Sequence, residues 1–176
     1  PVTLSVARDA AAATKLASDL VSGANGIFSY VAARTAVTST TGTSGTSTKA
    51  GIFASDSAVR SVNQGILSAA SLPVGTPPRS PSEIGISITK TGTMEFDESK
   101  FSAALAADPS GTAAKVQEIA TRIAAAATTA SDKFNGTLTQ KITGQQSEVR
   151  DLATRISDWD TRLESRKATL QRTYSG

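Results

Sequence analysis

Two pairs of carboxylates come closest to a catalytic arrangement in this sequence. Asp97 stands beside Glu98, and Asp158 and Asp160 flank Trp159. Paired carboxylates can divide general-acid and general-base roles, and glycosidases use such pairs. However, Asp97 stands where a helix is predicted to begin, and the second pair falls on the surface of a predicted coiled coil. We therefore interpret the first pair as helix capping and the second as solvated surface charge.

The remaining candidates for chemistry are also weak. The sequence has no histidine and no cysteine, so it lacks the usual imidazole base, the thiolate and the commonest metal ligands. Gly42 and Gly45 lie in a glycine-containing stretch, but the Gly-Lys-Ser/Thr of a phosphate-binding loop does not follow. Trp159 could stack on a ligand, yet packing is the simpler interpretation. We predict no enzyme activity, no catalytic residues, no cofactor and no metal.

Charge and hydropathy also exclude two classes of partner. The 18 basic and 15 acidic residues give a net charge of +3 and are interspersed along the chain, without the basic run that follows a phosphate backbone. No apolar run approaches the roughly 20 residues that a membrane-spanning helix needs. The sequence therefore predicts neither a nucleic-acid partner nor a membrane partner.

The clearest pattern is a heptad repeat near the end of the chain. Apolar residues recur every seven positions from Ile142 to Leu170, and a second series follows three places later, with charged residues on its flanks. This a/d pattern is typical of a coiled-coil helix. Polar residues in the second series either set register or partner number, or lie where the seam is open to solvent. The predicted assembly interface consists of Ile142, Gln145, Val149, Leu152, Ile156, Trp159, Leu163, Arg166 and Leu170.

The length of this helix predicts that its seam needs more than one partner. A helix over 138–174 would be about 55 Å long, whereas a preceding helix over 112–134 would be about 35 Å long. The shorter helix cannot cover the whole seam. The rest must pack on the first helix, on another copy, or on a segment outside this sequence.

The rest of the chain predicts a mainly α fold with one small β-hairpin, built as an elongated helical bundle with a long coiled-coil terminal helix. Apolar residues at helical spacing predict the upstream helices, with N-caps at Asp9, at Ser55 or Asp56, and at Asp97. Alternation predicts the hairpin. The glycines near Asn25 predict a kink or a close contact inside the first helix. The predicted helices span about 10–37, 56–72, 98–107, 112–134 and 138–174, and the hairpin spans about 84–96.

Three stretches have other assignments. Residues 38–49 are nearly all Ser, Thr and Gly, which predicts a mobile loop. The prolines between Pro73 and Pro81 predict an extended connection. Residues 2–6 alternate as a strand does, and the chain starts without Met. We therefore expect residues 1–9 to be the last strand of a truncated upstream β-domain, and 10–176 to be one helical domain.

Four segments in order resemble the carboxy-terminal region of flagellar filament-capping proteins, the flagellar hook-associated protein 2 family. They are Val2 to Asp9 with its following helix, in which Val21 and Asn25 match but Leu20 and Ala24 replace aromatic residues; Gly51 to Arg60; Ile84 to Pro109; and Val149 to Leu170. Residues 38–49 and 73–81 are unmatched.

The resemblance implies a structural protein of the bacterial flagellum. Members are secreted, form a homo-oligomeric ring at the filament tip and promote flagellin polymerisation, so flagellin and other copies are the implied partners. It also implies that an amino-terminal helix, outside this sequence, pairs with the terminal helix. This chain alone is compatible with a monomer. An alternative is a surface adhesin module that binds host glycans through residues 38–49 or through an upstream domain.

Overall fold

The computed structural model describes residues 9–43 and 45–175, and the predicted strand over residues 2–6 lies outside this part. The fold is mainly α, as predicted. It comprises two units, Pro1–Ala130 and Ser131–Gly176. None of the described helices is long and apolar enough to cross a membrane.

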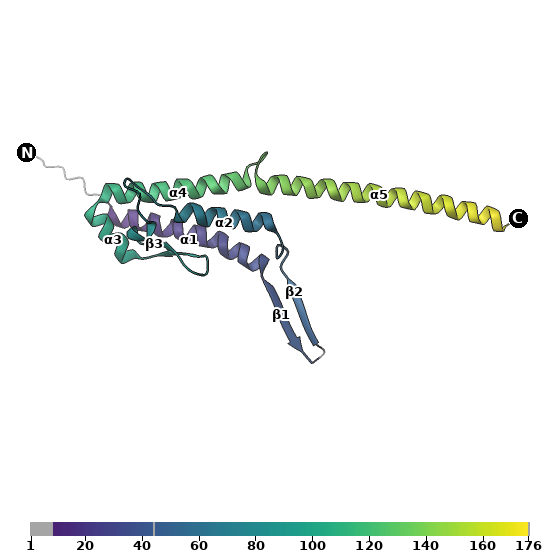
Figure 1. The fold of residues 1–176 in the computed structure, drawn as a ribbon, viewed down its shortest axis with the longest axis horizontal. Helices are drawn as coiled ribbons and strands as arrows, with labels where there is room; N and C mark the ends of the chain where they lie inside the picture. Colours follow the sequence, from purple (N-terminus) through teal and green to yellow (C-terminus); the bar gives the residue numbers. More distant parts are fainter. Residues whose placement is uncertain (1–8, 44, 176) are drawn as a thin grey trace, which may run out of the picture. The chain divides into compact units, whose positions relative to one another are not determined.

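The first unit holds four helices, a 3-10 turn and two small antiparallel sheets among its described residues (Figure 1). Its helices and the 3-10 turn are α1 (Ala10–Thr35), α2 (Ser57–Ser71), η1 (Pro81–Ile84), α3 (Glu98–Ala107) and α4 (Pro109–Ser131). Its strands are β1 (Val37–Gly42), β2 (Gly45–Ala50), β3 (Ile86–Ile88) and β4 (Met94–Phe96). The second unit is built from the single helix α5 (Thr137–Tyr174).

Aspartates begin three of the helices: Asp9 and Asp97 as predicted, and Asp56 out of the two predicted candidates Ser55 and Asp56. The Oδ1 atom of Asp9 accepts from Ala12 N at 2.9 Å, that of Asp56 from Ala58 N at 2.9 Å, and that of Asp97 from Lys100 N at 3.0 Å. Each bond satisfies a backbone donor that the first helical turn leaves without a partner. The bond from Lys100 is the main cause that holds the pKa of Asp97 below its ordinary value of 3.8.

This pKa shift predicts how stability depends on pH. A lowered folded-state pKa stabilises the fold above the unfolded value, and that contribution is lost as pH falls through the folded value. Asparagine can also cap a helix but does not titrate in this range. In urea unfolding we expect Asp97→Asn to be less stable than the unaltered protein at pH 6, and the difference to shrink at pH 3. A difference of equal size at both values would contradict the assignment.

The main core lies where α1, α2 and α4 meet the short β3–β4 sheet. Its most enclosed side chains include Ile66 of α2, Ile86 of β3 and Ile119 of α4, all no more than 2% exposed. A second cluster joins α1 to α3 through Ala17, Phe101 and Leu105. Burial of the isoleucine, phenylalanine and leucine side chains among them, at about 1.5–3 kcal/mol each, drives the association of the elements.

Asn25 fixes β4 against α1. Its Nδ2 atom donates to Met94 O and its Oδ1 atom accepts from Met94 N, both at 2.8 Å. The amide is suited to this because it carries a donor and an acceptor side by side. The predicted close contact near Asn25 is therefore present. It does not arise at Gly23 or Gly26, where an added Cβ would meet nothing within 4 Å, and α1 continues through both glycines.

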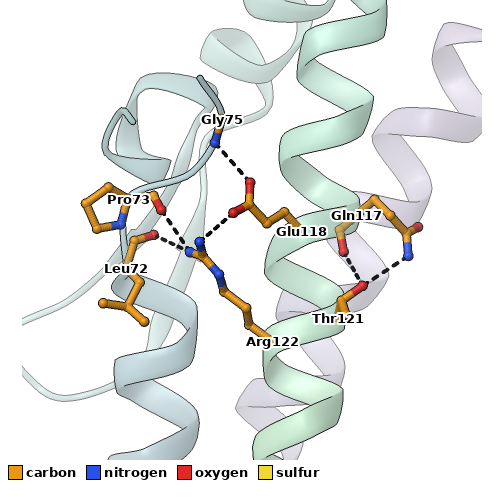
Figure 2. A network of polar contacts seen from close by, with 7 residues as sticks. All are labelled: Leu72, Pro73, Gly75, Gln117, Glu118, Thr121 and Arg122. Atoms are coloured by element: carbon orange, nitrogen blue, oxygen red, sulfur yellow. Dashed lines mark hydrogen bonds and ion pairs between the residues drawn. The ribbon is translucent and has the colours of Figure 1, made fainter. Parts of the chain in front are cut away.

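A polar network attaches the proline-rich connection to α4 (Figure 2). Arg122 donates through Nη1 to Leu72 O at 3.2 Å and to Pro73 O at 2.8 Å, so it satisfies carbonyls at the end of α2. Glu118 accepts from Arg122 Nη2 and, through Oε2, from Gly75 N at 2.9 Å. The predicted extended connection is therefore wrong: Val74 N donates to Arg79 O at 2.8 Å and Arg79 N to Val74 O at 2.9 Å, which closes residues 75–78 into a turn, and Pro81 opens η1.

The predicted loop over residues 38–49 is wrong, because the structure forms a β-hairpin there. Strands β1 and β2 pair in a continuous antiparallel register from Val37 opposite Ala50 to Gly42 opposite Gly45. The first predicted helix ends at Thr35 instead of 37, where this hairpin begins. The reason is that threonine, branched at Cβ, favours extended backbone, and glycine is favourable where the ladder ends, at the pair of Gly42 and Gly45.

Two other boundaries are corrected. The helix predicted over 112–134 runs from Pro109 to Ser131. Proline suits a first helical position, and the side chain of Asp132 ends the helix by accepting from Phe134 N and Asn135 N. The hairpin predicted over 84–96 has strands only at 86–88 and 94–96. Ile84 closes η1 instead, and Gly85 follows it at φ 80°.

Candidate assembly surface

The turn before α5 consists of residues 132–136. Asp132 Oδ1 accepts from Phe134 N at 2.9 Å and from Asn135 N at 2.6 Å, and these bonds hold the pKa of Asp132 below its ordinary value. Thr139 Oγ1 donates to Asp132 O at 2.7 Å. Gly136 is the N-cap residue and makes no side-chain bond. The turn therefore sets the start of α5 through side chains on both sides of it.

All nine predicted seam residues lie on α5, which is one uninterrupted helix of 38 residues. At 1.5 Å per residue it is about 57 Å long, in agreement with the length expected from the sequence. Seven residues make almost two helical turns, so the positions of the heptad fall on one slowly drifting stripe. The helix thus presents Ile142 to Leu170 as a single apolar stripe interrupted by Gln145 and Arg166.

The stripe is exposed along its whole length. No side chain of α5 is buried, and the seven apolar seam residues are between 47% and 66% exposed. Gln145 and Arg166 are exposed as well. A long apolar stripe on a helix typically marks a protein interface, because isolated helices gain their stability by covering such a face.

The flanks of the stripe carry charges that differ along its length. Arg155 and Arg162 lie at g positions, and Asp160 and Lys167 lie at e positions. The guanidinium of Arg162 stands 5.7 Å from the centre of the Trp159 ring, within the range of a cation–π contact. Trp159 itself is 60% exposed, so the packing expected for it from the sequence is not made within this chain.

The other residues that the sequence offered as candidates for chemistry lie in a helix cap, on an exposed helix surface or at the end of a hairpin. Asp97 caps α3, Asp158 and Asp160 are exposed on α5, and Gly42 and Gly45 close the β1–β2 hairpin. Within the described ranges, no group of three or more acidic, histidine or cysteine side chains could hold a metal ion. The prediction that the chain is not an enzyme stays a prediction.

Comparison with known proteins decides the family. The family described as "Flagellar hook-associated protein 2 C-terminus" matches residues 1–176, the whole of the sequence. The chain belongs to this family. The resemblance found in the sequence is thereby confirmed, and with it a place among flagellar hook-associated proteins. A comparison with curated proteins gave no match, and a comparison with solved structures gave none either.

Membership of the hook-associated protein 2 family makes the exposed stripe of α5 the strongest candidate for function. The match to a flagellar protein gives no support to the glycan-binding alternative. Sequence reasoning found the stripe because its signal is local and periodic. It missed the exposed β1–β2 hairpin, although the threonines of 38–49 carried a strand signal.

Proposed function

We propose that this chain is the helical part of a filament cap that promotes flagellin polymerisation at the tip of the flagellum, outside the cell. The family match over residues 1–176 carries the proposal. The uncovered stripe on α5 supports it, because an assembly factor acts through surfaces that bind other helices. Flagellin and further copies of the protein are its proposed partners.

We propose that the stripe is one side of a coiled coil. The nine seam positions are three or four residues apart, and the seven of them that are large and apolar can enter holes on a facing helix. Fully covering such side chains gives about 1.5–3 kcal/mol each. The stripe from Ile142 to Leu170 therefore offers a continuous apolar surface to a long partner helix, and the entropy of association offsets part of this gain.

The flanking charges favour a partner helix different from α5. If two copies of α5 paired in parallel, each g residue would face the e residue five places further on in the other copy. Arg155 would then meet Asp160, which is favourable, but Arg162 would meet Lys167, which is not. A helix with carboxylates opposite Arg162 and Lys167 fits better. We propose the amino-terminal helix of the full-length protein for this place.

The proposed mechanism uses no covalent step. In this mechanism the coiled coil that contains α5 forms a mobile leg of the cap, which releases one site at the growing tip and binds the next, so that each incoming flagellin finds an ordered place. Many weak helical contacts suit this better than one tight contact, because the dissociation rate limits how fast a cap can move.

Deletion of the gene for the full-length protein tests this function. We expect filaments to be absent or short and unpolymerised flagellin to collect in the medium, because subunits leave the tip before they are incorporated. Electron microscopy gives the filament length and immunoblotting gives the flagellin in the supernatant. The matched control is the deletion strain that carries the unaltered gene. Filaments of normal length in the deletion strain would overturn the proposal.

A further inference from the structure

The β1–β2 hairpin is the largest feature that neither the core nor the proposed coiled coil uses. Its two strands extend beyond the ends of α1 and α2 (Figure 1), and each of their residues is exposed. The hairpin is joined to the helices at its base, where Gly51 N donates to Ala36 O at 2.8 Å and Phe53 N to Arg34 O at 3.0 Å. A two-stranded ribbon without a covered face is only marginally stable in water.

The register shows which backbone groups point outward. In an antiparallel ribbon, directly opposite residues alternate between hydrogen-bonded and non-bonded pairs. Ala36 and Gly51 form a hydrogen-bonded pair at the base. The alternation therefore makes the pairs that residues 38, 40 and 42 form with β2 hydrogen-bonded as well. Val37, Ser39 and Thr41 therefore turn their N–H and C=O groups away from β2. Residues 46, 48 and 50 of β2 do the same on the opposite edge.

The edge of β1 lacks the features with which proteins block unwanted strand pairing. Exposed edges usually carry a proline, a bulge or a charged side chain. Residues 37–42 contain neither a proline nor a charge, and their register with β2 is continuous. Lys49, on β2, is the single charged residue of the two strands. The β1 edge is thus open to another strand.

We propose that the β1 edges of two copies of this chain pair antiparallel and form a four-stranded sheet. Outward groups must face outward groups, and a single register pairs all three outward residues of both β1 strands, with Ser39 of one copy opposite Ser39 of the other. In this register Thr38 faces Thr40 and Val37 faces Thr41. Pairs of threonine with threonine or serine stabilise neighbouring strands, and the hairpin already contains them, between Ser39 and Thr48 and between Thr41 and Thr46.

Three observations favour a second copy as the occupant. The edge has no charge with which to select a charged partner, and apart from Val37 it has no apolar side chain for a pocket to accept. In the antiparallel register its serine and threonine side chains face serine and threonine side chains of the other copy, except at Val37. If two copies paired through β2 instead, Lys49 of one copy would lie diagonally across from Lys49 of the other. Their Cα atoms would be roughly 8 Å apart, which is close enough for the two charges to repel each other.

This contact is expected to be weak when it acts alone. One added strand of six residues covers much less than the roughly 1,000 Å² that stable interfaces bury. It becomes effective where other contacts already hold copies close together, because the second contact is then intramolecular. The inference goes beyond the proposed capping role and does not depend on it, since the hairpin and α5 are separate surfaces.

Disulfide trapping in the full-length protein tests the pairing. This chain contains no cysteine, and any cysteine elsewhere in the protein would be replaced by serine. Ser39→Cys places one thiol on the proposed two-fold axis, where opposite Cα atoms are about 5.5 Å apart, within the range that a disulfide can bridge. Thr48→Cys is the matched control, because it lies directly opposite Ser39 on the outer edge of β2. Under mild oxidation we expect at least tenfold more cross-linked dimer from Ser39→Cys.

A second pair of variants separates edge pairing from chance collision. Proline at position 39 removes an outward N–H from β1, and Thr48→Pro removes one from β2, while bonds between the strands are kept. Cross-linking is then measured between a Thr41→Cys variant and a Val37→Cys variant, because these positions face each other in the proposed register. When both variants also carry Ser39→Pro, we expect at least tenfold less cross-linked dimer; when both carry Thr48→Pro instead, we expect no change. Equal trapping at positions 39 and 48, no trapping at 39, or trapping of flagellin in place of a second copy would each overturn the proposal. Normal filaments with any of these results would leave the capping role intact.

Discussion

Replacement of Phe101 by alanine is expected to lower the free energy of unfolding by about 3–5 kcal/mol. The side chain is 1% exposed and its ring centre lies 5.3 Å from that of Phe96. Its removal leaves a cavity between α1 and α3, in the cluster with Ala17 and Leu105. Because domains of this size are typically stable by about 5–15 kcal/mol, the loss would be a large share of the total. Urea unfolding followed by circular dichroism at 222 nm measures it.

The matched control for this prediction is Phe134→Ala, which removes the same atoms from a surface position. Phe134 is 75% exposed, so its replacement should change the free energy of unfolding by no more than about 0.5 kcal/mol. If Phe101→Ala cost less than about 1 kcal/mol, or as little as the control, the packing of α3 against α1 described above would be wrong.

Two aspartates in the α5 stripe are expected to abolish capping by the full-length protein. Ile156 and Leu163 are adjacent a positions in the middle of the stripe, 63% and 59% exposed in this chain. Loss of both apolar contacts costs about 3–6 kcal/mol of association free energy, which is roughly a hundredfold to ten-thousandfold in affinity. Strains with Ile156→Asp and Leu163→Asp should release unpolymerised flagellin, as measured by immunoblotting of the medium.

A control with the same added charge places it on the opposite face of α5. Thr154 and Thr161 are also seven residues apart, lie at f positions and are exposed. Thr154→Asp with Thr161→Asp should therefore leave filament growth near normal, and circular dichroism should show similar helix content in both double variants. Equal defects in the two strains would indicate that charge or helix stability, and not the stripe, causes the loss. Normal growth of the stripe variant would count against the coiled coil.

Much of the local structure could be predicted from the sequence because its signals lie within a few residues of one another. Asp9, Asp56 and Asp97 accept hydrogen bonds from backbone N–H groups only two or three residues further along the chain. The heptads of α5 repeat every seven residues, and the helix follows them without interruption. The family resemblance rested on such segments too, and it was confirmed over the whole sequence.

Only the tertiary structure decided what holds these elements together. Asn25 meets Met94 across 69 positions, and Arg122 meets Leu72 across 50. No periodicity can show such bonds, because they depend on where two distant backbones come to lie. The same holds for residues 38–49. Their composition fits a loop or a strand equally well, and cross-strand pairing, which joins residues up to 13 positions apart, makes them a hairpin with an open edge.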